Sequence, residues 1–135
     1  MPADEIHEWF FYAEENLAAA RVLLDAGYLN PCLHEAQQAA EKALKTIVLA
    51  KRMPLKKTHS IREIKAILFD AGVELDVSND DCMLMDSIYL PSKYPLGSSL
   101  PECEPDKEIC SHCIDVAHRA VNMARRVVEA LGVDE

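Results

Sequence analysis

The sequence predicts an all-α protein, an antiparallel bundle of four to five helices with a long proline-rich loop before the last helix. Apolar residues recur at three- and four-residue spacing along most of the 135 residues, which is the period of an amphipathic helix. No stretch alternates apolar and polar residues as a half-buried strand would. A chain of this length with half of its residues apolar builds one core, so residues 1–135 are expected to form a single domain.

The first helix is expected from about Asp4 to Ala26, because Gly27 suits the left-handed position that follows a helix. Four consecutive aromatic residues, 9–12, lie within it. Each residue of a helix is turned by about 100°, so these four side chains point all round the axis. One buried stripe cannot cover them all. We expect a loop or a second subunit to cover the outer ones, and we favour a homodimer, because large aromatic residues are enriched at interface cores.

The second helix is expected to begin at Asn30-Pro31, a cap followed by a proline in the first turn, and to end near Arg52. Its apolar face consists of Leu33, Ala36, Gln37, Ala40, Leu44, Ile47 and Val48. Beside this face runs a polar stripe of His34, Gln38, Glu41 and Lys45. Glu41 and Lys45 are four residues apart, a spacing that stabilises a helix by a few tenths of a kcal/mol.

A third helix is expected after the linker of residues 53–59. Ser60 and Glu63 have the spacing of a capping box, and Gly72 marks the end of the helix. Ser78 is a candidate cap for a fourth helix. We expect that helix to end before Pro91, because the residue before a proline is pushed away from helical geometry.

The segment from Pro91 to Pro105 contains four prolines and is predicted to be an extended loop. Loops of this length inside a compact domain are often functional. The last helix is expected from about Asp106 to Leu131, with Cys110 and Cys113 on its apolar side. Short connections between the other helices favour antiparallel neighbours.

Charge is unevenly distributed along the chain. The 14 Lys and Arg residues against 23 Asp and Glu residues give a net charge of −9. Residues 42–65 hold eight basic residues and one acidic residue, or +7, which leaves −16 for the rest. Such a basic segment can attract phosphate although the whole chain is acidic. The alternative is a lysine-rich, solvated helix end and loop.

Membrane insertion, secretion and metal binding are not expected. No apolar run approaches the roughly 18 residues of a membrane span, and the first residues are acidic rather than basic, so we expect a cytoplasmic protein. An odd number of cysteines, five, argues against a disulfide framework. Possible zinc ligands are Cys103, Cys110, His112, Cys113 and His118. The CxxC pair falls on an apolar helix face, where reduced cysteine packs as a small core residue, so we expect no metal and no cofactor.

Four short motifs follow one another along the chain. They are QQAAEKALK at 37–45, KTHS at 57–60, DSIY at 86–89 and SKYP at 92–95, and a long last helix follows them. In this order and spacing the sequence resembles the HEPN domain (higher eukaryotes and prokaryotes nucleotide-binding) over nearly its whole length. The resemblance implies a helical bundle, commonly a homodimer, of the small prokaryotic type that is often encoded beside a minimal nucleotidyltransferase.

The resemblance also implies a function. Such pairs are viewed as toxin–antitoxin modules, in which the HEPN protein is the toxin or the nucleotide- or RNA-binding member. Many HEPN proteins are metal-independent ribonucleases that use an Arg followed, after four to six residues, by a His. The His moves a proton and the Arg stabilises charge on phosphate. In this chain only Arg52 and His59 match that spacing, and they lie across the linker; Lys93 stands where this branch has an arginine before Tyr-Pro.

We therefore favour a role in binding nucleotide or RNA phosphate. The residues expected to bind it are Gln38, Glu41, Lys45, Lys56, Lys57, His59, Lys93 and Tyr94, with Gln38 and Glu41 orienting the others or contacting a base. Two alternatives stay open. One is a metal-independent ribonuclease with His59 as general acid and base and Arg52 as stabiliser of negative charge. The other is a structural adaptor that binds a protein through the outer aromatic residues of the first helix.

Overall fold

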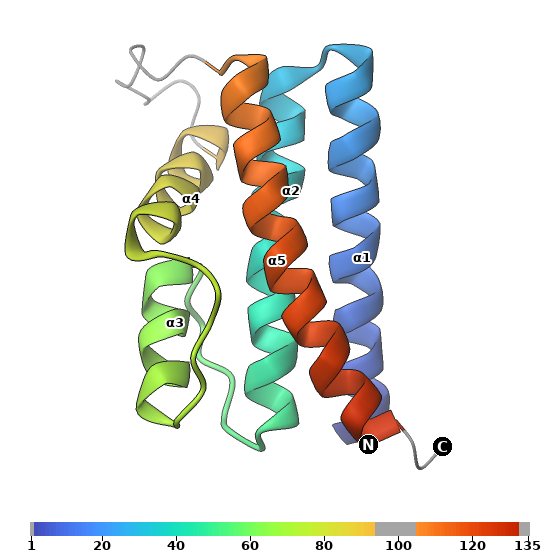
Figure 1. Cartoon of the computed structure of the whole chain (residues 1–135), viewed down its shortest axis with the longest axis vertical. Coiled ribbons are helices and arrows are strands. Elements are labelled where there is room, and N and C mark those ends of the chain that lie inside the picture. Colours follow the sequence, from blue (N-terminus) through green and yellow to red (C-terminus); the bar gives the residue numbers. More distant parts are fainter. Residues whose placement is uncertain (1, 94–104, 133–135) are drawn as a thin grey trace.

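The computed structural model describes residues 2–93 and 105–132, and all regular structure in these ranges is helical. The elements are α1 (Pro2–Ala26), α2 (Leu29–Ala50), α3 (Ile61–Asp70), α4 (Asn79–Lys93) and α5 (Lys107–Gly132). Figure 1 shows α1, α2 and α5 side by side, with α3 and α4 one above the other along α2. The predicted all-α antiparallel bundle is confirmed. None of the described helices is long and apolar enough to cross a membrane.

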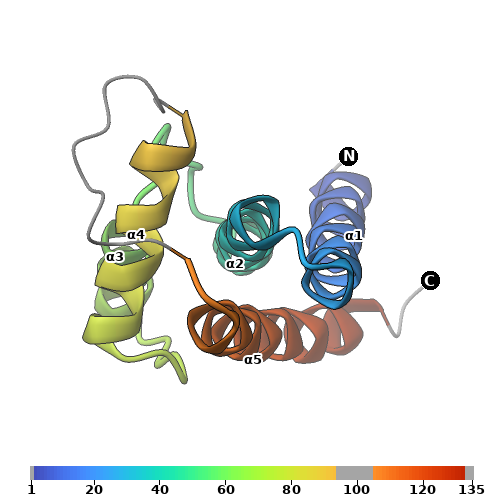
Figure 2. The ribbon, with the colours of Figure 1, turned by 90° about the horizontal axis from the view of Figure 1, so that it is seen from above.

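Helix α2 lies in the middle of the bundle. In Figure 2, α1 lies on one side of it, α3 and α4 lie on the other, and α5 lies across a third side; all four contact α2. Its buried residues accordingly include polar ones: Gln37, Glu41, Lys45 and Thr46. The polar stripe predicted for α2 is therefore partly interior, because neighbouring helices enclose more than the apolar face.

Several predicted helix ends are confirmed. Gly27 and Gly72 have φ angles of +86° and +88°, which end α1 and α3 in the left-handed region. Ser60 Oγ accepts a hydrogen bond from the Glu63 backbone N–H at 3.1 Å. Ser78 Oγ accepts one at 3.0 Å from the backbone of α4 in the same way. Short-range side-chain caps thus set the starts of α3 and α4.

Two predicted helix ends are wrong. Helix α2 begins at Leu29 without a side-chain cap, so Asn30 and Pro31 lie inside its first turn. The missing N–H of Pro31 has no effect there, since first-turn N–H groups lack an intrahelical acceptor. Helix α4 runs through Pro91 to Lys93, because a proline so near the end of a helix removes only one hydrogen bond. The rest of the predicted loop, 94–104, lies outside the described residues.

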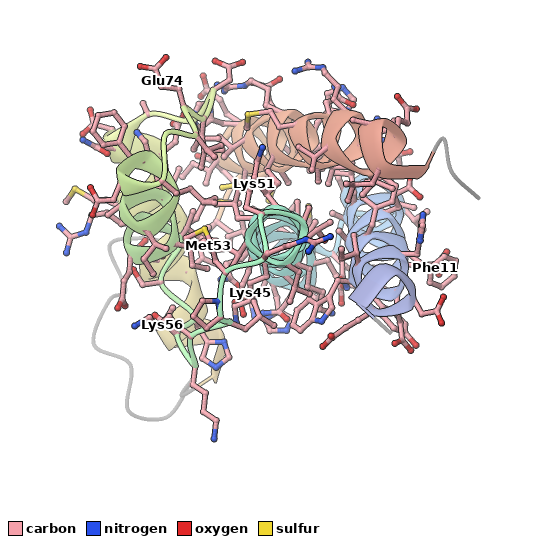
Figure 3. All side chains as sticks on the ribbon, turned by 90° about the horizontal axis from the view of Figure 1, so that it is seen from below. Phe11, Lys45, Lys51, Met53, Lys56 and Glu74 are labelled. Carbon is pink, nitrogen blue, oxygen red and sulfur yellow. The ribbon has the colours of Figure 1, made fainter. Side chains whose placement is uncertain are left out.

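Helix α1 presents two of its four consecutive aromatic residues to solvent. Phe11 is 53% exposed and Tyr12 is 49% exposed, whereas Trp9 and Phe10 are half-buried. Phe11 points away from the bundle in Figure 3. The described part of the chain leaves these two rings open to solvent, so the covering subunit stays a prediction.

The cysteines of the described ranges belong to the core, as expected. Cys32, Cys82, Cys110 and Cys113 are fully buried free thiols. Burial raises the pKa of Cys113 to about 12, with smaller contributions from nearby Cys110, Cys32 and Asp81. Within residues 2–93 and 105–132 there is no group of three or more side chains able to hold a metal ion. Cys103 lies outside these ranges.

Asp81 joins α4 to α5. Its carboxylate lies 2.8 Å from Nε2 of His112 and 3.7 Å from the guanidinium of Arg119, which also binds Asp115 at 2.8 Å. Burial raises the pKa of Asp81, but hydrogen bonds from His112 and Ser78 and the charges of His112 and Arg119 bring it below its usual value. The charged form of Asp81 is thus favoured in the folded protein.

Candidate functional site

A buried carboxylate on α2 forms the centre of the candidate site. The side chain of Glu41 is 6% exposed, and its Oε2 accepts a hydrogen bond from Lys45 Nζ at 2.9 Å. The same oxygen lies 2.9 Å from Nδ1 of His59, and Gln37 Nε2 donates to Oε1 at 3.3 Å. A carboxylate almost removed from water is thus held by an ammonium group, an imidazole and an amide.

The ammonium group of Lys45 is buried within this network. Its side chain is 8% exposed, and Nζ lies 5.8 Å from the centroid of the Trp9 ring. Separating two buried charges is costly because each then lacks its partner in a poorly solvated place. This placement suits Lys45 to hold the Glu41 side chain in position rather than to reach a ligand in solvent.

His59 is the exposed edge of the network. Its side chain is 53% exposed, and its bond to Glu41 orients the ring. A carboxylate hydrogen-bonded to one ring nitrogen fixes the orientation of the imidazole. The other ring nitrogen can then bind an anion or transfer a proton. The chemistry of His59 therefore depends on the Glu41–Lys45 pair behind it.

Helix α4 positions the segment that carries His59. The Asp86 carboxylate accepts hydrogen bonds from Ser60 Oγ at 2.8 Å, from the Ile61 N–H at 2.6 Å and from the Arg62 N–H at 3.3 Å. The N–H groups at a helix start attract anions, and here the protein supplies its own. A phosphate on this surface would have to bind side chains instead.

The linker adds positive charge beside His59. Lys56 and Lys57 are exposed. Figure 3 shows Lys45 and Lys56 on the same side of α2. A hollow lined partly by Lys45, Lys56 and Thr58 has free space of about 10 Å³, roughly the room of one water molecule. A nucleotide does not fit into it, so a ligand here would lie on the surface.

The basic segment 42–65 does not form one patch. Lys51 and Lys45 point to opposite sides of α2 in Figure 3. Lys42 turns towards α1, where Nζ donates to Asn16 Oδ1 at 2.9 Å. Lys65 Nζ donates to Asn79 Oδ1 at 3.1 Å at the start of α4. The charge that looks continuous in the sequence is thus divided among several faces of the bundle.

The other predicted residues are placed differently. Gln38 joins the network, since its Nε2 donates to Gln37 Oε1 at 2.7 Å. Arg52 lies just beyond α2, whereas Glu41, the partner of His59, lies nine residues before the last residue of that helix. The end of α2 is thus about 14 Å from Glu41 along the helix axis, and the pairing of Arg52 with His59 stays a prediction. Lys93 is the last residue of α4, and Tyr94 lies outside the described residues.

Sequence reasoning missed three residues that build this region. Trp9 and Asn16 of α1 contact Lys45 and Lys42, respectively. Asp86 of α4 holds the start of α3. Asp86 belongs to a motif that the sequence singled out, but no spacing in the sequence connects it to residues 25 positions away.

Comparisons with known proteins agree with this fold. A sequence model of the HEPN domain matches residues 6–129. The chain is similar to the crystal structure of ST0689, an archaeal HEPN homologue, with 24% identity and a TM-score of 0.67 over 91% of this chain and 97% of that one. It is also similar to TT1696 from Thermus thermophilus, with 26% identity and a TM-score of 0.72 over 90% and 97% of the two chains. No curated protein matches. Because the family match spans most of the helical bundle, the chain belongs to the HEPN domain family.

Proposed function

We propose that this HEPN protein binds phosphate groups of a nucleotide or of RNA on the surface formed by α2 and the linker around His59. The observation that carries the proposal is the buried Glu41–Lys45 pair, which orients a half-exposed imidazole. Lys56 and Lys57 stand beside that imidazole in the chain and are exposed. Imidazole and ammonium groups are suitable partners for phosphate oxygens.

Salt dependence tests this proposal. Binding of a fluorescein-labelled single-stranded RNA is measured by anisotropy at several salt concentrations. Lys56→Gln should weaken binding and lower the slope of log K against log salt by about 0.7, the value for one phosphate contact to a single strand. Lys51→Gln is the matched control, because Lys51 points to the opposite side of α2. Equal effects of the two variants would refute the assignment of the surface.

The same proposal includes partners. We infer a homodimer and a minimal nucleotidyltransferase partner in a cytoplasmic toxin–antitoxin type pair. The family resemblance supports the pairing, and the exposed ring of Phe11, which points away from the bundle in Figure 3, supports the dimer. Light scattering should give twice the 15.1 kDa mass of the chain at micromolar concentration. A monomer would exclude the dimer, and absence of co-purification with a nucleotidyltransferase co-expressed from the same operon would exclude the pair.

A second candidate function is RNA cleavage by His59 without a metal ion. The contact between Glu41 Oε2 and His59 Nδ1 favours it, because a general acid or base needs an oriented ring. In this hypothesis purified protein cleaves RNA in the presence of EDTA, and His59→Ala abolishes cleavage. Arg52→Gln tests the Arg52 role separately. Cleavage that persists in His59→Ala would refute the assignment.

A further inference from the structure

Lysines and aromatic rings meet along the seam between α1 and α2. Lys42 Nζ lies 5.8 Å from the centroid of the Tyr12 ring, and Lys45 Nζ lies 5.8 Å from that of Trp9. Both distances are within the range of cation–π attraction. The two rings are three residues apart on α1 and the two lysines three apart on α2, so each pair occupies neighbouring turns. We call these four residues the seam strip.

Core packing explains Trp9 better than it explains Tyr12. Tyr12 is 49% exposed, and Phe11 meets it edge-on with ring centroids 5.5 Å apart. Lys42 is held in place, since Nζ donates to Asn16 Oδ1 at 2.9 Å and Asn16 Nδ2 donates to Glu35 at 2.6 Å. A half-exposed ring beside an already ordered cation is prepared for a ligand, because little further side-chain entropy is lost on binding.

The seam strip is continuous with the candidate phosphate surface. Lys45 belongs to both, because its ammonium group contacts Trp9 on one side and Glu41 on the other. Glu41 in turn contacts His59. Rings that follow a row of positive side chains are the arrangement by which proteins bind single-stranded nucleic acid, with bases stacked on the rings and phosphates near the cations.

The charges of the seam strip separate its contribution from that of the linker. Lys45 is paired with Glu41, and Lys42 donates to the neutral amide of Asn16, which in turn donates to Glu35. The two rings contribute stacking and carry no charge. Salt-dependent attraction is expected mainly from lysines, among them the exposed linker residues Lys56 and Lys57.

From this arrangement we infer that bases of single-stranded RNA stack on the seam strip, with Tyr12 as the principal platform. The phosphates of the same strand lie on the candidate phosphate surface around His59. The inference rests on the proposed function and deepens it. A ligand that reaches from Tyr12 of α1 to the linker is a strand of several nucleotides, not a mononucleotide.

Two measurements on RNA binding test the inference. Tyr12→Leu should weaken binding of a labelled oligoribonucleotide by roughly 5-fold or more while leaving the salt slope unchanged, since stacking is lost and no charge is. Tyr12→Phe keeps the ring and should bind as the wild type does. Tyr28→Leu is the matched control, because Tyr28 is 62% exposed and lies beyond the far end of α1.

Trp9 supplies a readout that needs no variant. It is the single tryptophan of the chain, so its fluorescence should be quenched as RNA is added, with the same midpoint as the anisotropy change. A mononucleotide at the same concentration should cause little quenching. Unchanged Trp9 fluorescence at saturating RNA would refute the inference.

The outcomes distinguish the inference from the proposed function. If Tyr12→Leu binds RNA normally while Lys56→Gln binds weakly, the seam strip is refuted and the phosphate surface stands. If the wild-type protein binds a nucleotide but no RNA, the inference is refuted and the proposed function stands; if it binds neither, both fail. If Tyr12→Leu loses RNA binding only because light scattering shows that it has become monomeric, the ring covers a second copy of the chain, and the inference is refuted.

Discussion

Removing the charge of Glu41 should destabilise the fold far more than removing a surface charge. In Glu41→Gln the ammonium group of Lys45, only 8% exposed, loses its charged partner. Breaking a buried ion pair from one side costs about 3–5 kcal/mol. The remaining amide oxygen still accepts a hydrogen bond from Lys45, so we expect the lower end, about 3 kcal/mol. For a chain of this size that lowers the melting temperature by about 10 °C.

The chain contains a matched control for this prediction. Asp115 and Arg119 are also four residues apart on one helix and 2.8 Å apart, but Asp115 is 61% exposed. Asp115→Asn should cost less than about 1 kcal/mol, because solvent already stabilises both charges. Urea unfolding followed by far-UV circular dichroism gives the free energy of unfolding of both variants.

A double variant completes the comparison. Glu41→Leu with Lys45→Met removes both charges together and should recover most of the stability that Glu41→Gln loses, since no unpaired buried charge remains. The reasoning is refuted if Glu41→Gln costs no more than Asp115→Asn. It is equally refuted if the double variant is no more stable than Glu41→Gln.

Three further predictions concern other parts of the bundle. Asp86→Ala should lower the free energy of unfolding by about 1–2 kcal/mol, because the first N–H groups of α3 lose their acceptor. Ser87→Ala, at an exposed neighbouring residue, should lower it less. Equal losses of the two variants in urea unfolding would contradict this prediction. The lowered pKa of Asp81 stabilises the fold above the unfolded value of about 3.9, and this is lost as pH falls through the folded value. Wild type should therefore lose more stability than Asp81→Asn between pH 5 and pH 2, and parallel curves would exclude the effect. Burial raises the pKa of Cys32 and Cys113 to about 12, so iodoacetamide at pH 8 should label them only after unfolding; labelling in the native protein, seen by mass spectrometry, would disprove it.

The helices were predictable where their signals are local. Ser60 with Glu63, and Gly27 at the end of α1, act within one helical turn, and the structure confirms them. The helix start predicted at Asn30 and the helix end predicted before Pro91 were wrong, because both residues are tolerated inside a helix near its ends. Local rules indicate a preference, and packing against neighbouring helices decides how far a helix extends.

The candidate site was predictable in part. The family motifs led to Glu41, Lys45 and His59, which the structure brings together. The pairing of Arg52 with His59 rests on sequence spacing alone and stays a prediction. Asn16 and Asp86 could not be found from the sequence, since each acts on residues of another helix.

By itself, the sequence determined the helical class, most helix boundaries, the family resemblance and the residues that share a face of α2. Tertiary structure alone decided that α2 lies at the centre of the bundle, so that Glu41 and Lys45 are buried and the basic segment divides among several faces. The physical reason is that periodicity shows which side chains lie together on one helix. It does not show how many other helices cover them, and burial sets whether a charge is a solvated surface group or a paired group that orients its neighbours.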